Sequence, residues 1–589
     1  MDTLTKQTPG SAMKLAEAAR ILREAAQGDT PPLRVLLACG FEPLHLRAFL
    51  AAEMQQRLLS YKVQVEVGSY DDCLGTISTA SADGIDAVFV ALEWADLDPR
   101  LGIRRTPKWC KEVQGDIIRS VDQRIAHFAQ AMENRARANP LTVCLPTLPL
   151  LPMTHFPTWQ ASAFELDLRN RLAGFAARVG ADPRIRVVHP GALDQLSPAG
   201  ERIDVRSETL FGFPYTLPHA SMIARLFCRT MYPPPSRRGL ITDLDDTLWR
   251  GILGEVGSEG VSWHLDCHSH MHGVYQQLLW SLANTGVLIG IASKNDPALA
   301  QEALARPDLI LTQDLVFPVE AHWEPKSVSV ARILEAWNLG AESVVFVDDS
   351  PAEIAEVERS HPGIECLLFP RGDDGAICRL IERLRDLFGK PEVSKEDRIR
   401  SQSVRRTANL NRPGNGTAAE EFLQESRARL SVRLDAGPSD SRALELVNKT
   451  NQFNLNGRRY VRSEWESVIR EAGAFLLVVD YEDRYGPLGK VAVITGHRNG
   501  GTLQIRSWAM SCRAFARRIE DRCLELLFTR LGVEEIELDY RTTERNGPMH
   551  AFLARYAPAA EGTPVIISRQ AFWRLCPPLY HEVEVLSNG

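Results

Sequence analysis

Short apolar runs alternate with helical stretches over the first 230 residues of the chain. The apolar runs lie at 33–40, 63–70, 86–94, 141–151 and 185–191. The segments between them carry apolar residues at helical spacing, and buried strands separated by helices are typical of a parallel sheet with crossover connections. We therefore expect an α/β domain over residues 33–230, preceded by a polar tail and a short helix at 1–32.

A second alternating series follows the proline-rich segment 231–239, which cannot continue a helix or a strand ladder. Its apolar runs lie at 240–246, 287–296, 309–313, 344–350 and 364–370. The same reasoning predicts a second α/β domain with a parallel sheet over residues 236–390.

The pattern changes after residue 390. Residues 391–425 are charged and poor in apolar side chains, which predicts a linker containing a helix. Strands then follow one another with few helices between them, at 429–434, 474–482, 489–497 and 502–510. This order is typical of an α+β domain with an antiparallel sheet, which we place at 426–589. The fold class is therefore α/β, in several domains.

Composition narrows the class of protein. A chain of 589 residues is too long for one hydrophobic core, and 44% hydrophobic with 24% charged residues excludes an extended disordered chain. The net charge of −7 disfavours a nucleic-acid partner. No apolar run reaches the roughly 18 residues of a membrane span, no signal peptide is visible, and the 11 cysteines form no CxxC pair. We expect a cytoplasmic protein without a membrane partner.

The strongest chemical signal is Asp243-Leu244-Asp245-Asp246-Thr247, which directly follows an expected strand. Acids at i and i+2 after a buried strand both point to the carboxyl edge of the sheet, where ligands bind in open α/β folds. Later strands in the same domain end in further polar residues, namely Ser293 with Asn295, Lys326, and Asp348 with Asp349. Carboxylates hold Mg²⁺, a lysine neutralises phosphate charge and a hydroxyl positions a phosphoryl oxygen. Unrelated polar strand ends are the alternative.

These motifs resemble those of phosphotransferases of the haloacid-dehalogenase (HAD) superfamily, over about residues 239–390. The resemblance implies that Asp243 is the nucleophile, Asp245 the general acid and base, Ser293 the second-motif hydroxyl and Lys326 the third-motif lysine. It also implies that Mg²⁺ is held by Asp243, by the backbone carbonyl of Asp245 and by the acidic motif Asp348-Asp349. Thr247 and Asn295, in the same motifs, are expected to contact the substrate.

A narrower resemblance includes residues far downstream. The segments 243–255, 448–460 and 508–513 together resemble the FkbH-like proteins, and this likeness runs from about 33 to 556. These are HAD enzymes of polyketide and related pathways, fused to a C-terminal domain like the GNAT acetyltransferases. The resemblance implies transfer of a glyceryl unit from 1,3-bisphosphoglycerate to the phosphopantetheine of an acyl carrier protein, with loss of phosphate. A plain Mg²⁺-dependent phosphatase and a catalytically retired scaffold are the alternatives.

Spacing also bears on the substrate. Only 50 residues separate Asp243 from Ser293 and 33 separate Ser293 from Lys326, so neither gap holds a large cap domain. An uncapped site leaves its acids open to a bulky substrate, which favours a macromolecular partner.

The C-terminal domain departs from the GNAT pattern at its pyrophosphate-binding turn. Arg513 is present, but Ala516 and Arg518 stand where glycines are expected, which disfavours ordinary acetyl-CoA chemistry. Arg513, Arg517, Arg518 and Arg522 are expected either to meet the pantetheine phosphate and the carrier protein or to form a solvated helix face.

We expect Cys512 to form an acyl thioester. It lies between a strand and a helix expected to start at Arg513, where the dipole and guanidinium groups lower a thiol pKa. Simple packing at the sheet end is the alternative, and Cys267 is the second candidate. Four other thiols, Cys39, Cys144, Cys228 and Cys523, are expected to be small core hydrophobes.

Two other clusters of polar residues are candidate sites. Asn448, Lys449, Asn451 and Gln452 predict either a polar pocket for the acyl hydroxyls or simple caps and turns. The histidines between His264 and His272 could share a helix face as metal ligands, or bind no metal.

The first domain resembles the SGNH-hydrolase-like module of FkbH-like proteins, but Gly40-Phe41-Glu42 stands where a hydrolase needs serine. We expect His219 to be structural and the domain to be a non-catalytic docking module.

Overall fold

The computed structural model divides the chain into two compact units, Met1–Pro234 and Pro235–Gly589, and each is described by itself. The residues that the structure describes are 12–28, 30–105, 110–150, 155–157, 159–393, 397, 400, 404, 420, 423–434, 437, 440–450, 452–484, 486–511, 514, 517–543, 546–557 and 564–586. Within them, no helix is both long and apolar enough to cross a membrane.

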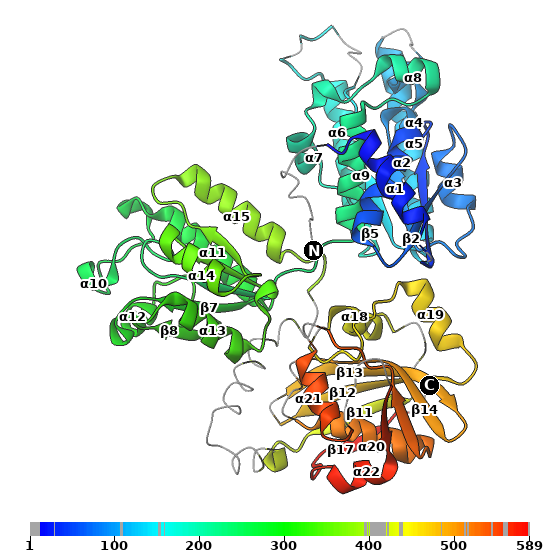
Figure 1. Ribbon diagram of the computed structural model, residues 1–589. Helices are drawn as coiled ribbons and strands as arrows, with labels where there is room; N and C mark the ends of the chain where they lie inside the picture. Colours follow the sequence, from blue (N-terminus) through cyan, green and yellow to red (C-terminus); the bar gives the residue numbers. More distant parts are fainter. Residues whose placement is uncertain are drawn as a thin grey trace. The chain divides into compact units, whose positions relative to one another are not determined.

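The first unit is built on a parallel five-stranded sheet of order β2-β1-β3-β4-β5 (Figure 1). Its strands are β1 (Pro32–Cys39), β2 (Lys62–Val67), β3 (Ala87–Ala91), β4 (Leu141–Cys144) and β5 (Ile185–Val187). Its helices are α1 (Leu15–Ala26), α2 (Leu44–Arg57), α3 (Cys73–Thr79), α4 (Trp94–Leu97), α5 (Lys111–Ala136), α6 (Ala163–Val179), α7 (Pro190–Leu196), α8 (Val205–Phe211) and α9 (Leu217–Met231). The predicted parallel arrangement is confirmed.

The expected strand at 141–151 is too long. It ends at Cys144, because Pro146 and Pro149 cannot donate to a strand ladder. Every residue of β3 and β4 is buried, as expected for central strands covered on both faces.

The second unit begins with another parallel sheet, of order β10-β9-β6-β7-β8. Its strands are β6 (Gly239–Thr242), β7 (Leu288–Ser293), β8 (Val316–Ala321), β9 (Val344–Asp348) and β10 (Glu365–Leu368). Its helices are α10 (Leu253–Val256), α11 (His270–Asn284), α12 (Pro297–Leu304), α13 (Lys326–Trp337), α14 (Pro351–Ser360) and α15 (Asp374–Phe388). Residues of α11 and α15 share one core cluster, and residues of α13 and α14 share another.

Two details of this sheet were not expected. The run 309–313 is not a strand; Leu309 and Leu311 are buried, and β8 begins only at Val316. Strand β8 contains Pro318, which is tolerated because β8 lies at the sheet edge.

Gly239 is required by packing, because a Cβ atom there would lie 2.5 Å from the Trp337 ring of α13.

The remainder of the second unit contains a seven-stranded sheet of order β16-β15-β14-β13-β12-β11-β17. Its strands are β11 (Arg429–Leu434), β12 (Ala474–Asp483), β13 (Gly486–Asn499), β14 (Thr502–Met510), β15 (Glu535–Leu538), β16 (Val565–Ser568) and β17 (Glu582–Val585). The helices are α18 (Ser441–Lys449), α19 (Arg462–Arg470), α20 (Ile519–Leu531), α21 (Gly547–Ala554) and α22 (Arg569–Leu575).

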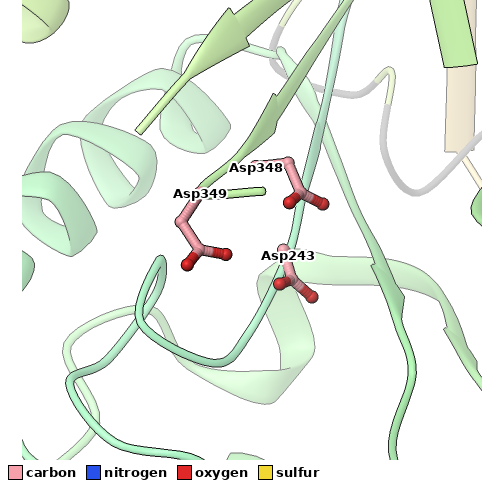
Figure 2. Close-up of side chains that lie close together, drawn as sticks. All are labelled: Asp243, Asp348 and Asp349. Atoms are coloured by element: carbon pink, nitrogen blue, oxygen red, sulfur yellow. The ribbon is translucent and has the colours of Figure 1, made fainter. Parts of the chain in front are cut away.

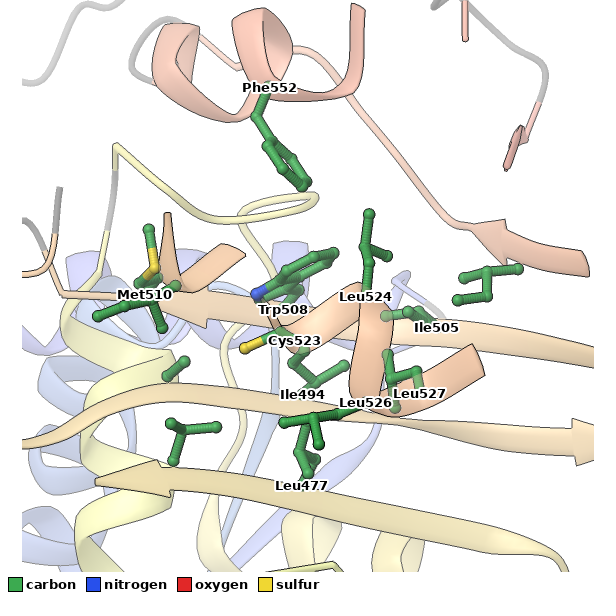
Figure 3. Close-up of a cluster of buried hydrophobic side chains, with 14 of the residues drawn as sticks. Leu477, Ile494, Ile505, Trp508, Met510, Cys523, Leu524, Leu526, Leu527 and Phe552 are labelled. Carbon is green, nitrogen blue, oxygen red and sulfur yellow. The ribbon is translucent and has the colours of Figure 1, made fainter. Parts of the chain in front are cut away.

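This sheet is mixed rather than purely antiparallel. The pairs β14–β15 and β11–β17 are parallel, while β11 to β14 pair antiparallel in sequence order. Helix α20 supplies the crossover that a parallel β14–β15 pair requires. Its apolar face packs on the sheet, and Cys523 and Leu527 belong to the same core cluster as Ile494 and Trp508 (Figure 3). The thiols expected in cores, Cys39, Cys144, Cys228 and Cys523, are all buried.

Candidate active site

Three neighbouring strands bring the predicted residues to one edge of the β6–β10 sheet. Thr242 of β6 is level with Ile291 of β7 and with Val347 of β9. The residues that follow these positions, including Asp243, Ser293 and Asp348, therefore lie together at the carboxyl edge.

Three carboxylates converge at this edge (Figure 2). One oxygen from each of Asp243, Asp348 and Asp349 lies within 4.8 Å of the others, and all three residues are buried. Burial raises the pKa of the Asp348 carboxyl, and the neighbouring Asp243 charge raises it further. The pKa of Asp349 is also raised by burial, although the Arg371 guanidinium acts in the opposite direction. Such a group of acids needs cations to balance it.

Lys326 supplies one of those cations. Its Nζ atom lies 3.0 Å from Asp243 Oδ1, 2.6 Å from Asp348 Oδ2 and 2.5 Å from Glu353 Oε2. Burial acts to lower the pKa of Lys326, but the three carboxylates outweigh it and hold that pKa above its ordinary value. Lys326 is therefore a buried ammonium group at neutral pH.

Asp245 lies in the same loop but its side chain does not join the carboxylate cluster. Its Oδ1 accepts hydrogen bonds from Trp249 Nε1 and from the Leu253 N–H, each at 3.1 Å. Its Oδ2 accepts one from Asn295 Nδ2, also at 3.1 Å. Burial, together with the Asp243 charge, raises the pKa of Asp245 despite these hydrogen bonds. A raised pKa suits a group that must carry a proton. The side chain of Asp245 is therefore not placed to bind the metal ion, and only its backbone carbonyl would contact the ion.

The other predicted substrate contacts lie beside Asp245. Asn295 Nδ2 also donates to Ser293 Oγ at 3.0 Å, so one amide connects the hydroxyl to the acid. Ser293, Asn295 and Thr247 are all buried, and Thr247 Oγ1 has no hydrogen-bond partner among the described residues.

The carboxylate cluster fits a magnesium ion. Asp243 Oδ1 is buried and accepts no hydrogen bond within the described part of the chain, since the nearby Lys326 ammonium lacks the required geometry. Three hard oxygen donors from aspartates are the ligand set that Mg²⁺ prefers. The residues that would hold the ion are Asp243, Asp348 and Asp349.

The histidine-rich segment does not form a second such cluster among the described residues. It is not one helix, because a 3-10 turn (Leu265–Cys267) precedes α11. His264 Nε2 lies 3.2 Å from Asp308, His270 Nε2 lies 3.7 Å from Asp374, and His272 Nδ1 lies 3.0 Å from the Thr247 carbonyl. The alternative in which His264, His268 and His272 share one helix face as metal ligands is therefore not formed.

A scan against protein-family models and a search of curated proteins both found no match to this chain. Among solved structures, the chain is similar to the N-terminal part of a Bacteroides fragilis protein that contains a phosphatase domain, complexed with Mg. The identity is 20% and the TM-score 0.49, over 64% of this chain and 99% of that chain.

Two other solved structures are similar to smaller parts of the chain. One is a GDSL-like protein of Parabacteroides merdae, with 8% identity and a TM-score of 0.25 over 35% of this chain and 98% of that chain. Another is a cAMP-binding acyltransferase of Mycobacterium smegmatis, with 15% identity and a TM-score of 0.17 over 30% of this chain and 57% of that chain.

Two residues of the β6–β10 site were not anticipated. Glu353, in the first turn of α14, contacts Lys326 and also lies 3.0 Å from Lys294 Nζ. Arg371 follows β10 and pairs with Asp349, while lying 3.9 Å from Asp246. In the sequence, only the position of Glu353 indicates its role, since it lies one helical turn after Asp348 and Asp349.

Most polar groups of the pocket predicted in the C-terminal part form hydrogen bonds or ion pairs with residues nearby in the sequence. Asn448 donates to the Tyr460 carbonyl at 2.8 Å and accepts from the Tyr460 N–H at 2.9 Å. Lys449 pairs with Glu445 on the same helix, and Gln452 Oε1 is buried without a hydrogen-bond partner among the described residues. Asn451 lies outside the described residues. Binding of an acyl group here stays a prediction.

Of the four arginines expected to bind the carrier or to form a solvated helix face, the structure describes Arg517, Arg518 and Arg522, and the burial of Arg517 contradicts the expectation for that residue. Helix α20 starts at Ile519 rather than at Arg513. Arg517 is buried with its guanidinium 5.4 Å from the centre of the Tyr481 ring. Arg518 and Arg522 donate to the carbonyls of Pro578 and Leu579 respectively. These three arginines therefore stabilise their own domain.

The two residues on which the thioester hypothesis depends, Cys512 and Arg513, lie outside the described residues. The hypothesis stays a prediction. Cys267, the second candidate, is exposed.

The first unit shows why a serine hydrolase site is not formed after β1. A Cβ atom on Gly40 would lie 1.8 Å from Asp96 Oδ1, so the position cannot carry a serine without displacing that acid. His219 is fully buried between Thr147 Oγ1 and Ser197 Oγ, at 2.8 and 2.9 Å. Burial, aided by Arg202, lowers the pKa of His219 to about 3, as expected for a structural histidine.

Proposed function

We propose that residues 239–388 catalyse Mg²⁺-dependent phosphoryl transfer through an aspartyl-phosphate at Asp243, as HAD-type phosphatases do. The observation that carries the proposal is the buried cluster of Asp243, Asp348 and Asp349, with the Lys326 ammonium in contact with two of them.

In the first half-reaction the Asp243 carboxylate attacks phosphorus and the bond from phosphorus to the leaving oxygen breaks. Asp245 gives its proton to that oxygen, for which its raised pKa prepares it. Mg²⁺ bound by the three aspartates would neutralise the charge of the phosphoryl group. Lys326 balances the same charge from its buried position, and Ser293 with Asn295 is placed to orient a phosphoryl oxygen.

In the second half-reaction Asp245, now ionised, takes a proton from water while that water attacks the aspartyl-phosphate. Phosphate leaves, and Asp243 regains its carboxylate. The hydrogen bond between Asn295 and Asp245 holds the acid in one orientation for both steps.

The full substrate proposal follows the FkbH-like resemblance. We propose that the acyl group of a donor of the 1,3-bisphosphoglycerate type passes from its acyl phosphate to the pantetheine thiol of an acyl carrier protein, with release of that phosphate and of the thiol proton. Asp243 then takes the remaining phosphate ester, which leaves a glyceryl unit on the carrier. Support comes from the small size of the insertion between β6 and α11, whose helices are α10 and the single 3-10 turn Leu265–Cys267. A site without a cap admits a protein-borne substrate.

One incubation separates this proposal from a plain phosphatase. The protein is mixed with Mg²⁺, 1,3-bisphosphoglycerate and a carrier protein of its pathway, and the carrier is weighed by mass spectrometry. A glyceryl mass on the carrier supports acyl transfer. Free phosphate with an unmodified carrier supports the plain phosphatase, and no phosphate release at all contradicts both.

Metal removal gives a second check. Exhaustive chelation should abolish phosphate release, and added Mg²⁺ should restore it, since the cluster has no other divalent charge to balance it. Full activity after chelation contradicts the proposed mechanism.

A further inference from the structure

The first unit contains a cavity of ≈ 100 Å³ that the proposed chemistry does not use. It lies at the carboxyl edge of the β1–β5 sheet, because its lining includes Gly40 after β1, Glu93 and Asp96 after β3, and Leu148 after β4. This is the edge at which open α/β sheets bind ligands. The lining residues all belong to the first unit.

The cavity is acidic. Four carboxylates line it, those of Asp71, Glu93, Asp96 and Glu208, against a single guanidinium from Arg104. Arg104 is already paired with Glu208 at 2.7 Å. Among the described residues, neither Asp71 nor Asp96 forms an ion pair with a lysine, arginine or histidine, so the cavity has negative charge to offer a ligand.

Glu93 differs from the other acids because its carboxylate is already fully engaged. It accepts hydrogen bonds from Thr147 Oγ1 at 2.6 Å, from the Tyr215 hydroxyl at 2.8 Å, and from the N–H groups of Thr147 and Leu148 at 3.2 Å. Four donors satisfy a carboxylate, so Glu93 shapes the cavity rather than binding through it.

Asp96 is presented to the cavity by two features of the backbone. Its Oδ2 accepts from the Glu93 N–H at 2.7 Å, and its Oδ1 lies against Gly40, where no side chain intervenes. Asp71 stands beside it in the left-handed region, at φ 58°, held by a hydrogen bond from its N–H to the Gly40 carbonyl. A non-glycine residue in that region is a strained conformation that clusters at ligand sites.

Aromatic rings complete the lining. Phe41 and Trp94 are buried, and Tyr70 is half exposed at the rim. Aromatic faces beside unpaired carboxylates attract organic cations, which gain both charge pairing and cation–π contact. A bare divalent metal is disfavoured, because among the described residues the only converging group of three metal ligands is at Asp243.

We propose that this cavity binds the ammonium group of a small organic amine, with Asp96 and Asp71 as its counter-charges. The ligand class is a protonated amine attached to a compact apolar or aromatic body. The site makes the first unit a ligand-binding domain and not a docking surface alone.

The proposal also predicts how binding depends on pH. Burial raises the pKa of Asp96 to about 7, and the Glu93 and Asp71 charges add to this while Arg124 acts against it. The other titratable groups facing Asp96 are the thiols Cys39 and Cys73, whose pKa values burial raises, so both stay neutral. An amine remains protonated up to about pH 9. Its apparent affinity should therefore rise about tenfold from about pH 6 to about pH 8, as Asp96 ionises.

The test is calorimetric titration of the full chain with benzylamine, and with benzyl alcohol as the neutral ligand of the same shape. Benzylamine should bind with a dissociation constant on the order of 1 mM, and benzyl alcohol about tenfold more weakly. Asp96→Asn should weaken benzylamine about tenfold and remove the pH dependence. Asp71→Asn, which keeps a residue type that accepts the left-handed conformation, should weaken it severalfold, and the exposed control Asp83→Asn should not.

Equal binding of benzyl alcohol would overturn the proposal, as would no detectable benzylamine binding at concentrations on the order of 10 mM. Benzylamine affinity unchanged by both Asp71→Asn and Asp96→Asn would overturn it equally.

Discussion

The two parallel sheets of this protein both end their central strands in acids, but they balance those acids differently. After β6 and β9, Asp243, Asp348 and Asp349 gather around a shared point, with the Lys326 ammonium touching two of them. After β3, Glu93 is satisfied by neutral donors, and no ion pair reaches Asp96 within the described residues. We propose that the same edge of the same kind of sheet serves a different chemistry in each of the two domains.

The difference indicates that the arrangement of the acids and their neighbouring groups determines what each sheet edge can bind. Converging carboxylates with a buried cation create a place for a metal and a phosphoryl group. Carboxylates beside aromatic rings, at Gly40 where no side chain intervenes, are proposed to bind an organic cation instead. Four substitutions test the two halves of this comparison.

The largest expected effect is that of Asp243→Asn. A carboxamide is neither a nucleophile nor a good Mg²⁺ ligand, so phosphate release should disappear while the far-ultraviolet circular dichroism stays unchanged. Asp266→Asn, an exposed acid of the same domain, is the matched control and should retain full turnover. If Asp243→Asn released phosphate as fast as the control, the β6–β10 edge would not be the catalytic site.

Asp245→Asn should lower turnover by about 10²–10⁴-fold, because the leaving group and the attacking water both lose their proton-transfer partner. With acetyl phosphate, whose acetate leaves without needing a proton, the phosphorylated enzyme should accumulate, since only its hydrolysis then needs Asp245. Rapid-quench measurement of phosphate bound to protein reports this directly. Wild-type turnover in the variant would assign the proton transfer to another residue.

Lys326→Met should destabilise the second unit by about 3–5 kcal/mol, because it leaves Asp243 and Asp348 buried without the ammonium group that pairs with both. Added Mg²⁺ should recover part of that loss by supplying positive charge to the same acids. Urea unfolding with and without Mg²⁺ measures both effects. A variant as stable as the parent in the absence of metal would show that Asp243 and Asp348 are not ionised at the same time.

Gly40→Ser should destabilise the first unit by about 1–3 kcal/mol, since its Cβ atom would lie 1.8 Å from Asp96 Oδ1. It should not create esterase activity, although a serine then stands after the first strand. Gly174→Ser is the control, because a Cβ atom there meets no atom within 4 Å. Esterase activity in Gly40→Ser would contradict the structural explanation for the missing nucleophile.

Much of the fold and the β6–β10 site could be predicted because their signals are local. Apolar runs locate parallel strands, and strands that share a register bring the residues after Thr242, Ile291 and Val347 to one place. Strand β8 was missed because an edge strand with Pro318 and partly exposed residues lacks a continuous apolar run.

Other residues could not be predicted because tertiary packing decides their roles. Glu353 and Arg371 reach the site from a helix and a loop that no motif spacing connects to Asp243. Arg517 reads as a surface charge in the sequence, yet it is buried beneath the Tyr481 ring, which lies 36 positions earlier in the chain. The acidic cavity is assembled from five separate segments of the chain, including residues of α4 and α8, so no short stretch of sequence predicts it.

The most direct test of the central claim is chemical trapping of the aspartyl-phosphate. Enzyme turning over a phosphorylated substrate with Mg²⁺ is quenched with borohydride, which reduces an aspartyl-phosphate to homoserine, and the peptides are mapped by mass spectrometry. The account predicts homoserine at position 243 alone, and none when Asp243→Asn is used. Reduction at another aspartate, or phosphate release without any trapped residue in Asp245→Asn, would contradict it.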